Sequence, residues 1–326
     1  MEPKMLTGDV AGFLKITNQA ILKKIKTKQL PYSKTGKNVF FGYGTAKEIF
    51  NFKFTPKVIA FQIVKGGVGK TAISHALAAR ASLYGAKVLC IDLDQQANLT
   101  KHFGINSNNL PVMIDVIKGN AKIENSLVEI TDGIHLFPSR IDNAILDDHI
   151  MIESLRLDKV YKEHIDNLRD YYDLILIDCP PALGRSVAAA ALASDCIFAP
   201  VTPDAQCLTG LDLLYDGLKS IKKKYSRLVP LKILMNKFDG RTVLSREILA
   251  KLLDHSIYRE CLLNTYIRQN QDFANFCAAS ISIFDSIKPS TAKEDIDFLT
   301  QETLDLFTKK PNQQENVSLV SIEATL

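Results

Sequence analysis

The sequence predicts an α/β fold with a doubly wound, mostly parallel sheet, preceded by a small basic module. Two observations carry this prediction. From Lys57 onward, wholly apolar segments alternate with amphipathic helical segments, which is typical of parallel strands joined by crossover helices. Residues 1–57 instead contain eleven lysines and only three acidic residues, a net charge of +8 in a chain whose total is +4. Such a basic module predicts a polyanionic partner, although a solvated lysine face explains the charge equally well.

Composition limits the class of protein. The chain has 326 residues, of which 46% are hydrophobic, enough for one large domain and a small one. No apolar run reaches the roughly 18 residues of a membrane span, and the N-terminus lacks the apolar segment of a secretory signal. The six cysteines form no CxxC pair, so we expect core thiols of a cytoplasmic protein: Cys90, Cys179, Cys196, Cys207, Cys261 and Cys277.

Pro56 separates the two predicted domains, because it interrupts regular structure just before a strongly apolar segment. We therefore expect a basic module at 1–56, the main domain at 57–310 and a flexible polar tail at 311–326. Helical spacing and capping residues predict four elements in the module. These are a helix over 9–14, a helix over 18–28 capped by Thr17, a strand over 39–41, and a helix over 46–50 capped by Thr45.

The main domain begins with a strand at 58–64 and a helix from Lys70 to about Tyr84, which Gly85 should terminate. Four more apolar segments follow. Because each is apolar along its whole length, we expect strands buried on both faces at 88–93, 174–177, 196–201 and 231–235.

The loop between the first of these strands and its helix has the composition of a phosphate-binding loop. Gly66, Gly67 and Gly69 allow the backbone N–H groups to face a triphosphate, and the helix dipole adds positive potential. Lys70 would neutralise phosphate charge, and Thr71 would supply a hydroxyl to Mg²⁺. The strict motif has glycine where this chain has Val64. We predict nucleotide contacts from Lys65, Gly66, Gly67, Val68, Gly69, Lys70, Thr71 and Ala72.

Carboxylates follow two of the predicted strands. Asp92 and Asp94 end one strand and Asp178 ends another, at the sheet edge where ligands bind in such folds. Asp178 fits a Mg²⁺ ligand. Asp92 and Asp94 share a face of an ideal strand, so one could assist the metal while the other meets an attacking water.

Four segments in this order resemble the ParA/MinD family of ATPases. They are Lys65–Thr71, a deviant Walker A motif with an extra lysine; Asp92–Asn98, a switch segment in which Gln95 replaces the usual proline; Ile177–Pro181, a Walker B segment; and Ala199–Pro203 with Gly210-Leu211. The resemblance spans about residues 57–300.

The resemblance implies an ATPase that uses ATP and Mg²⁺ and forms an ATP-dependent homodimer. It implies that Lys65 reaches the nucleotide of the partner subunit and that Asp94 positions the attacking water, so the predicted catalytic residues are Lys65, Lys70 and Asp94. Thr71, Asp92 and Asp178 are the predicted metal ligands. By the same resemblance Asn236 and Pro203 lie near the adenine.

The basic module resembles the winged helix-turn-helix that precedes the ATPase in plasmid-type ParA proteins, with a recognition helix at 17–28 and a wing at 34–41. Asn18 and Gln19 would reach bases, while Lys23 and Lys24 would hold phosphates. Family resemblance also places non-specific DNA contacts near Arg268 and Lys288. Alternatively, the module only supports dimerisation through Phe13, Leu14, Phe40 and Phe41.

We therefore predict a cytoplasmic DNA-partition ATPase for a plasmid or chromosome, nucleoid-associated when ATP is bound. It would coat DNA as a dimer and be released when a ParB-like centromere-binding protein stimulates hydrolysis. The module would bind an operator and repress the protein's own gene. The alternative is a MinD-like ATPase that positions division machinery on a membrane, but residues 317–326 contain no lysine or arginine for a basic amphipathic membrane helix. A metal- or cluster-loading ATPase would need clustered cysteines.

Overall fold

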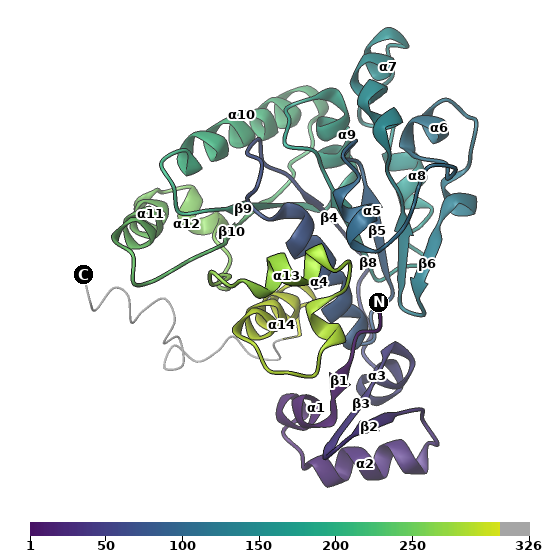
Figure 1. The fold of residues 1–326 in the computed structure, drawn as a ribbon. Coiled ribbons are helices and arrows are strands. Elements are labelled where there is room, and N and C mark those ends of the chain that lie inside the picture. The colour runs from purple at the N-terminus through teal and green to yellow at the C-terminus, as the bar shows by residue number, and fades with distance from the viewer. Residues whose placement is uncertain (307–326) are drawn as a thin grey trace.

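A computed structural model describes residues 1–306 (Figure 1). Its centre is a seven-stranded sheet. The strand order is β10-β9-β4-β8-β5-β7-β6, and every pairing is parallel except that of β6 with β7. This confirms the predicted doubly wound, mostly parallel sheet. The strands are β4 (Lys57–Phe61), β5 (Val88–Asp92), β6 (Val128–Thr131), β7 (Ile134–Phe137), β8 (Leu174–Asp178), β9 (Cys196–Val201) and β10 (Leu231–Met235).

Helices cover both faces of this sheet. One face carries α6 (Met113–Ile117), η1 (Ile123–Ser126), η2 (Ile141–Ile145), α7 (Leu146–Ile152), α8 (Lys162–Asp166), α9 (Arg185–Ala193), α10 (Cys207–Tyr225), α11 (Val243–Asp254) and α12 (Tyr258–Cys261). The other carries α4 (Lys70–Leu83), α5 (Asn98–His102), α13 (Asp272–Ala278), η3 (Ile283–Asp285) and α14 (Thr291–Thr303).

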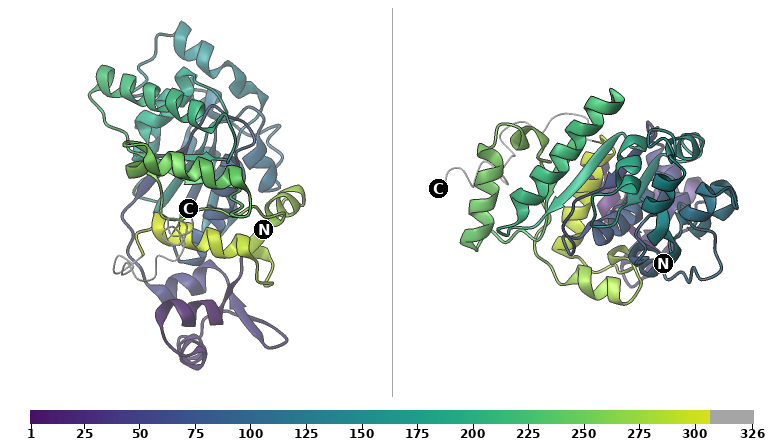
Figure 2. Two further views of the ribbon diagram at one scale, coloured as in Figure 1. Left: turned by 90° about the vertical axis from the view of Figure 1, so that its left-hand side faces the viewer. Right: turned by 90° about the horizontal axis from the view of Figure 1, so that it is seen from above.

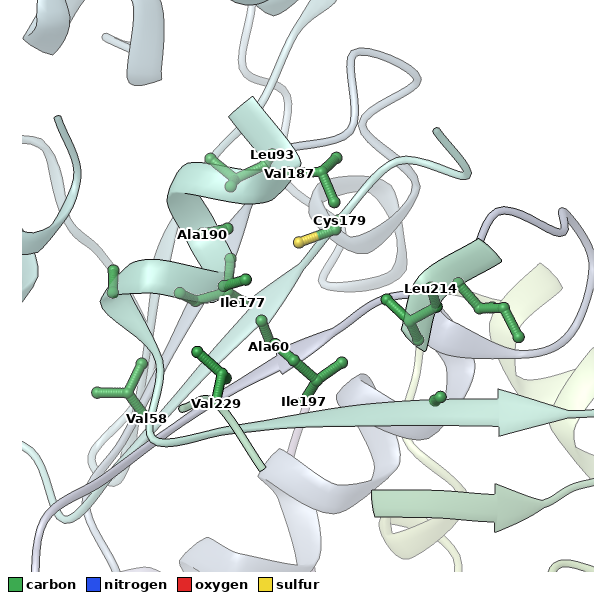
Figure 3. Packing of buried hydrophobic residues seen from close by; sticks show 14 of the residues in the cluster. Val58, Ala60, Leu93, Ile177, Cys179, Val187, Ala190, Ile197, Leu214 and Val229 are labelled. Carbon is green, nitrogen blue, oxygen red and sulfur yellow. The ribbon is translucent and has the colours of Figure 1, made fainter. Parts of the chain in front are cut away.

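Alternate residues of each central strand enter the two cores. On β4, Val58 and Ala60 are buried under α9 and α10, whereas Ile59 and Phe61 are buried on the side of α4 and α14. Figure 3 shows the first core, with Val187 and Ala190 of α9 close to the sheet. The apolar character of these strands therefore reflects burial on both faces.

The predicted elements of the main domain are largely confirmed, with two differences. The first strand, β4, ends at Phe61 and not at Val64. Gln62 still donates its backbone N–H to the carbonyl of Phe198 at 3.0 Å, and its side chain donates to the carbonyl of Val187 at 2.9 Å. The short strands β6 and β7 were not predicted. The predicted boundary at 310 and the tail at 311–326 lie outside the described residues. No helix within residues 1–306 is both long and apolar enough to span a membrane.

The N-terminal module folds as β1 (Met5–Leu6), α1 (Thr7–Leu14), α2 (Asn18–Thr27), β2 (Ser33–Thr35), β3 (Asn38–Phe41) and α3 (Tyr43–Phe50), with a small sheet in the order β1-β3-β2. Thr17 caps α2 by accepting from the N–H of Ala20, as predicted. The predicted cap at Thr45 is wrong, because α3 begins at Tyr43. The buried Thr45 hydroxyl instead donates to the carbonyl of Pro31 at 2.6 Å.

The module packs directly on the main domain, at one end of the molecule below α14 (Figure 2). Helix α3 lies against two turns that enter β5 and β7 at their N-terminal ends. Gly85 has φ +90°, and a Cβ atom there would lie 2.8 Å from Cα of Lys47; at Gly133 it would lie 2.4 Å from the ring of Tyr43. The module therefore occupies the sheet edge opposite the phosphate-binding loop.

A buried polar network closes this junction. Arg80, near the C-terminal end of α4, pairs with Asp297 of α14 at 2.5 Å and donates to the sulfur of Met5 at 3.2 Å. Tyr84 and Gln301 also donate to the Asp297 carboxylate, at 2.8 and 2.9 Å. One helix thus begins at the phosphate loop and ends in contact with the module.

Candidate phosphate-binding site

The loop between β4 and α4 has the backbone that a phosphate site needs. Gly67 and Gly69 have φ of +74° and +96°, which residues with side chains rarely adopt. A Cβ atom on Gly69 would also lie 2.4 Å from the side-chain nitrogen of Asn236. Position 69 therefore needs glycine for two reasons: its backbone conformation disfavours other residues, and the Asn236 side chain leaves no room for a Cβ atom.

Lys70 is buried at the centre of the loop. Its ammonium group donates to the carbonyls of Ile63 at 3.3 Å and Lys65 at 3.1 Å. Burial lowers the pKa of Lys70, and the nearby charge of Asp178 opposes this shift. A cation held in this position, at the N-terminus of α4, can neutralise an anion bound by the loop.

Thr71 and Asp178 come together across the sheet. The Thr71 hydroxyl donates to Oδ2 of Asp178 at 2.6 Å. Asp178 is fully buried, and its Oδ1 has no hydrogen-bond partner within residues 1–306. Burial raises the pKa of Asp178, and the charge of Asp92 adds to this effect. A hydroxyl beside an unsatisfied carboxylate oxygen is a donor set that fits Mg²⁺, so Thr71 and Asp178 would hold the ion.

Asp92 and Asp94 have different surroundings. Asp92 accepts from the N–H of Asp94 and from both the N–H and the hydroxyl of Thr100, at 3.1, 2.9 and 2.7 Å. It therefore fixes the turn between β5 and α5. Asp94 is buried and accepts from the N–H of Gln96 with Oδ1 at 3.0 Å. Fewer hydrogen bonds engage Asp94, which leaves it better able to orient a water molecule.

Lys65 is held within its own chain. Its ammonium group lies 2.5 Å from Oδ2 of Asp204 in the loop after β9. Thr202 also donates to that oxygen, at 2.6 Å, and the N–H of Gln206 donates to Oδ1. Pro203 lies in the same loop. Any role of Lys65 beyond this chain requires it to leave Asp204.

Asn236 and Lys237 clamp the loop from the end of β10. The Asn236 amide donates to the carbonyl of Val68 at 2.7 Å, and Lys237 donates to that of Gly67 at 2.9 Å. The contact of Asn236 with adenine stays a prediction, since its amide now contacts the loop.

The predicted DNA-contacting residues of the module divide into two groups. Asn18, Gln19 and Lys23 are exposed on α2. Lys24 is turned inward and donates to the carbonyl of Ile49 at 2.7 Å, so it does not lie on the outer face. The exposed Lys26 lies about one turn beyond Lys23.

The two predicted DNA contacts in the main domain also differ. Lys288 is exposed. Arg268 pairs with Asp295 at 2.6 Å and with Glu294 at 3.0 Å, which joins its loop to the start of α14. A phosphate would have to compete with two carboxylates for this guanidinium. The structure therefore gives Arg268 an internal ion-pair role that the sequence did not predict.

Three site residues were missed from the sequence: Thr100, Asp204 and Lys237. Asp204 follows Pro203 directly, so its position beside a motif could have drawn attention to it. Thr100 looks like any helix residue, and only the fold brings it to Asp92. Lys237 follows Asn236, but its approach to the loop depends on the sheet order.

A strand–loop–helix phosphate site at the carboxyl edge of a parallel sheet, with a lysine, a threonine and a strand-end aspartate, defines a P-loop nucleoside triphosphatase. The profile of a family described as "AAA domain" matches residues 56–231. The chromosome-partitioning ATPase Soj of Treponema pallidum is 31% identical over 217 residues, 66% of this chain and 83% of that protein. The chain belongs to the ParA/MinD family of P-loop ATPases.

Solved structures agree on the fold. A plasmid partition protein from Borrelia burgdorferi is 24% identical with a TM-score of 0.57, covering 69% of this chain and 97% of that chain. The septum site-determining protein MinD from Pyrococcus horikoshii, complexed with Mg-ADP, is 23% identical with a TM-score of 0.60, covering 78% of this chain and 98% of that chain.

Proposed function

We propose that this protein is a DNA-partition ATPase that hydrolyses ATP to ADP and phosphate with Mg²⁺. The observation that carries the proposal is the convergence of Lys70, Thr71 and Asp178 on one loop, in a chain that also carries a basic module. Similarity to Soj, named a chromosome-partitioning ATPase, supports the same function.

Each residue has a role in the proposed reaction. Lys70 neutralises the phosphates, while Thr71 and Asp178 hold the Mg²⁺ ion, which would shield the negative charge of the phosphates. Asp94 orients the attacking water. Asp92 contributes to the metal site indirectly, because it fixes the turn between β5 and α5. The loop N–H groups from Gly66 to Ala72 face the phosphates, and Pro203 and Asn236 border the base.

ATP would also join two copies of the chain. In the proposed dimer Lys65 leaves Asp204 and contacts the nucleotide bound by the partner subunit, since a triphosphate carries more negative charge than one carboxylate. The dimer binds DNA without sequence preference, with Lys288 as a candidate contact and Arg268 as a weaker one. A ParB-like centromere-binding protein stimulates hydrolysis and releases the dimer.

We propose that the module reads an operator through the outer face of α2. Thr17 caps this helix, and its exposed side chains include the amide of Gln19 and the cations of Lys23 and Lys26. Lys34 and Lys37 add exposed charge on the β2–β3 hairpin. An amide pairs with adenine in the major groove, while lysines hold phosphates.

DNA binding of the full-length protein, measured with ADP and with ATP, tests this function. We expect tight, salt-sensitive binding to random DNA only with ATP. The Asp94→Ala variant should still bind random DNA with ATP. It should not be released from the DNA, because it no longer hydrolyses ATP. Lys65→Ala should bind ATP as a monomer and fail to coat DNA. ATP-independent binding to random DNA would contradict the proposal.

A further inference from the structure

The main domain has an apolar hollow that is separate from the phosphate site. Its volume is about 420 Å³, and Figure 3 labels two residues that line it, Val187 of α9 and Leu214 of α10. Lys70, Thr71 and Asp178 do not line it. A hollow of this size can hold a small organic molecule. Its floor consists of apolar side chains that are less than a tenth exposed: Ile63, Val187, Leu214, Leu218 and Ile221.

The chemistry of this lining favours an apolar occupant. Gln62 and Ser220 also line the hollow, and the side chains of both already have partners within the chain. The Gln62 amide donates to the carbonyl of Val187, and the Ser220 hydroxyl donates to that of Asp216, both at 2.9 Å. A sugar or a nucleobase would lose hydrogen bonds to water here without replacing them at these groups, whereas an alkyl chain has none to lose.

Two charged side chains of α10 line the rim of the hollow, and their surroundings differ. Asp216 pairs with Lys219 at 2.6 Å. Lys224 lies over the ring of Tyr225, with its ammonium group 5.4 Å from the ring centre, and forms no ion pair within residues 1–306. The carboxylate is therefore already paired with a cation, whereas the ammonium group of Lys224 can bind an anion.

An adjoining hollow does not alter this balance of charge. It shares part of its lining with the first and is also lined by Asp147, Asp148 and Arg185. Asp147 accepts from the N–H of Ser186 at 2.7 Å. One exposed acid and one exposed base remain, and their charges oppose each other. Lys224 is therefore the charged group that selects the head group of an occupant.

We propose that the hollow binds a medium-chain fatty carboxylate, with its alkyl chain along α10 and its head group at Lys224. The lining residues of α10 begin at Leu213, and the helical steps from there to Lys224 span about 17 Å. An extended chain of about twelve carbon atoms has nearly this length. The chain would cover Leu213, whose side chain is 46% exposed, and the carboxylate would meet the ammonium group.

Isothermal titration of the nucleotide-free protein with a series of fatty carboxylates, each below its micelle concentration, tests the length of the site. From octanoate to dodecanoate, each added methylene group should strengthen binding about fourfold, because it removes one more group from water. Tetradecanoate should gain less, since its last carbons project beyond the hollow. Dodecylamine, which has the same chain but a cationic head, should bind more weakly than dodecanoate.

Gly217→Leu tests the position of the chain. Gly217 lines the hollow, and a Cβ atom there would meet no other atom within 4 Å, so a leucine fits and fills part of the space. Leucine favours a helix more than glycine does, so α10 should fold normally. Dodecanoate should bind this variant about tenfold more weakly. The matched control is Gly12→Leu on α1, where a Cβ atom also meets nothing within 4 Å; it should bind dodecanoate like the wild type.

Lys224→Glu tests the head group. It should weaken dodecanoate binding about tenfold and strengthen dodecylamine binding, because the charge at the rim is reversed. Lys223→Glu makes the same change at an exposed neighbour that does not line the hollow, and should alter neither affinity.

Three results would overturn the proposal. They are equal affinities for dodecanoate and dodecylamine, equal losses in a test variant and its matched control, and binding to phosphatidylglycerol vesicles without binding to dodecanoate. The last would mean that the surface recognises a membrane and not a single chain. The site does not depend on the proposed function: dodecanoate binding as expected in a protein without ATP turnover would leave the site in place and refute the ATPase.

Discussion

The two ends of α4 show how differently one helix can be anchored. At its N-terminal end, Lys70 contacts carbonyls of its own loop, five and seven positions earlier in the chain. At its C-terminal end, Arg80 and Tyr84 contact Asp297, more than two hundred positions away. The contacts of Lys70 are therefore local in the sequence, whereas those of Arg80 and Tyr84 depend on the whole fold.

The largest expected effect concerns the module end. Arg80→Met leaves Asp297 without its buried cation, and breaking such a pair costs about 3–5 kcal/mol. Urea unfolding of the ligand-free protein measures this loss. Arg259→Met, whose pair with Glu260 is more than half exposed on both sides, should cost about 1 kcal/mol or less. Equal losses of unfolding free energy in the two variants would show that the buried network at Arg80 stabilises the fold no more than an exposed ion pair does.

The next effect concerns the loop end. Lys70→Ala should weaken ATP binding about 100-fold, because a charged hydrogen bond to phosphate is lost. Isothermal titration measures the affinity. The control is Lys237→Ala, which removes another ammonium group close to the loop but not at its centre. We expect its affinity to change less than tenfold; wild-type affinity in Lys70→Ala would refute the phosphate assignment.

A smaller effect tests what the module does. Removing residues 1–56 would expose the core that they share with α4 and α14, so point variants of α2 are a cleaner test. Gln19→Ala should lower affinity for the protein's own promoter about tenfold and leave random DNA unaffected. Lys23→Ala should weaken both. Unchanged promoter preference in Gln19→Ala would favour the alternative in which the module only supports dimerisation.

The last expected effect is a dependence of stability on pH. Burial raises the pKa of Asp178 from 3.8 to about 8, so the folded chain binds this proton more tightly than the unfolded chain. The stability of the ligand-free protein should therefore fall as pH rises from about 4 to about 8. Asp178→Asn removes this loss and should raise Tm at pH 8. Thermal scans at pH 5 and pH 8 compare the two proteins; a lower Tm for the variant at pH 8 would contradict the argument.

The sequence predicted the loop end well because its signals are local. Glycines, a lysine and a threonine lie within one heptapeptide, and apolar strands of five or six residues end in the aspartates. Parallel strands bring their carboxyl ends to one edge, so Asp178 could be placed near Thr71 although 107 positions separate them.

The module end could not be predicted in the same way. Nothing near Arg80 indicates that its partner is Asp297, and Gly85 looked like a simple helix terminator when it also makes room for α3. Lys24 and Arg268 were misplaced for a related reason. A basic side chain is exposed or ion-paired according to its neighbours in space, which composition does not reveal.

The first residues of the chain have a particular consequence for how the protein is made. The N–H of Glu2 donates to Asp285, and that of Lys4 donates to the carbonyl of Phe284, both at 2.9 Å. A segment near Glu2 therefore has its contacts in one that is synthesised 283 positions later. During translation the module must wait on the ribosome, with part of its apolar surface uncovered, until η3 and α14 emerge. Completion of the module's own sequence is therefore not enough to close the junction.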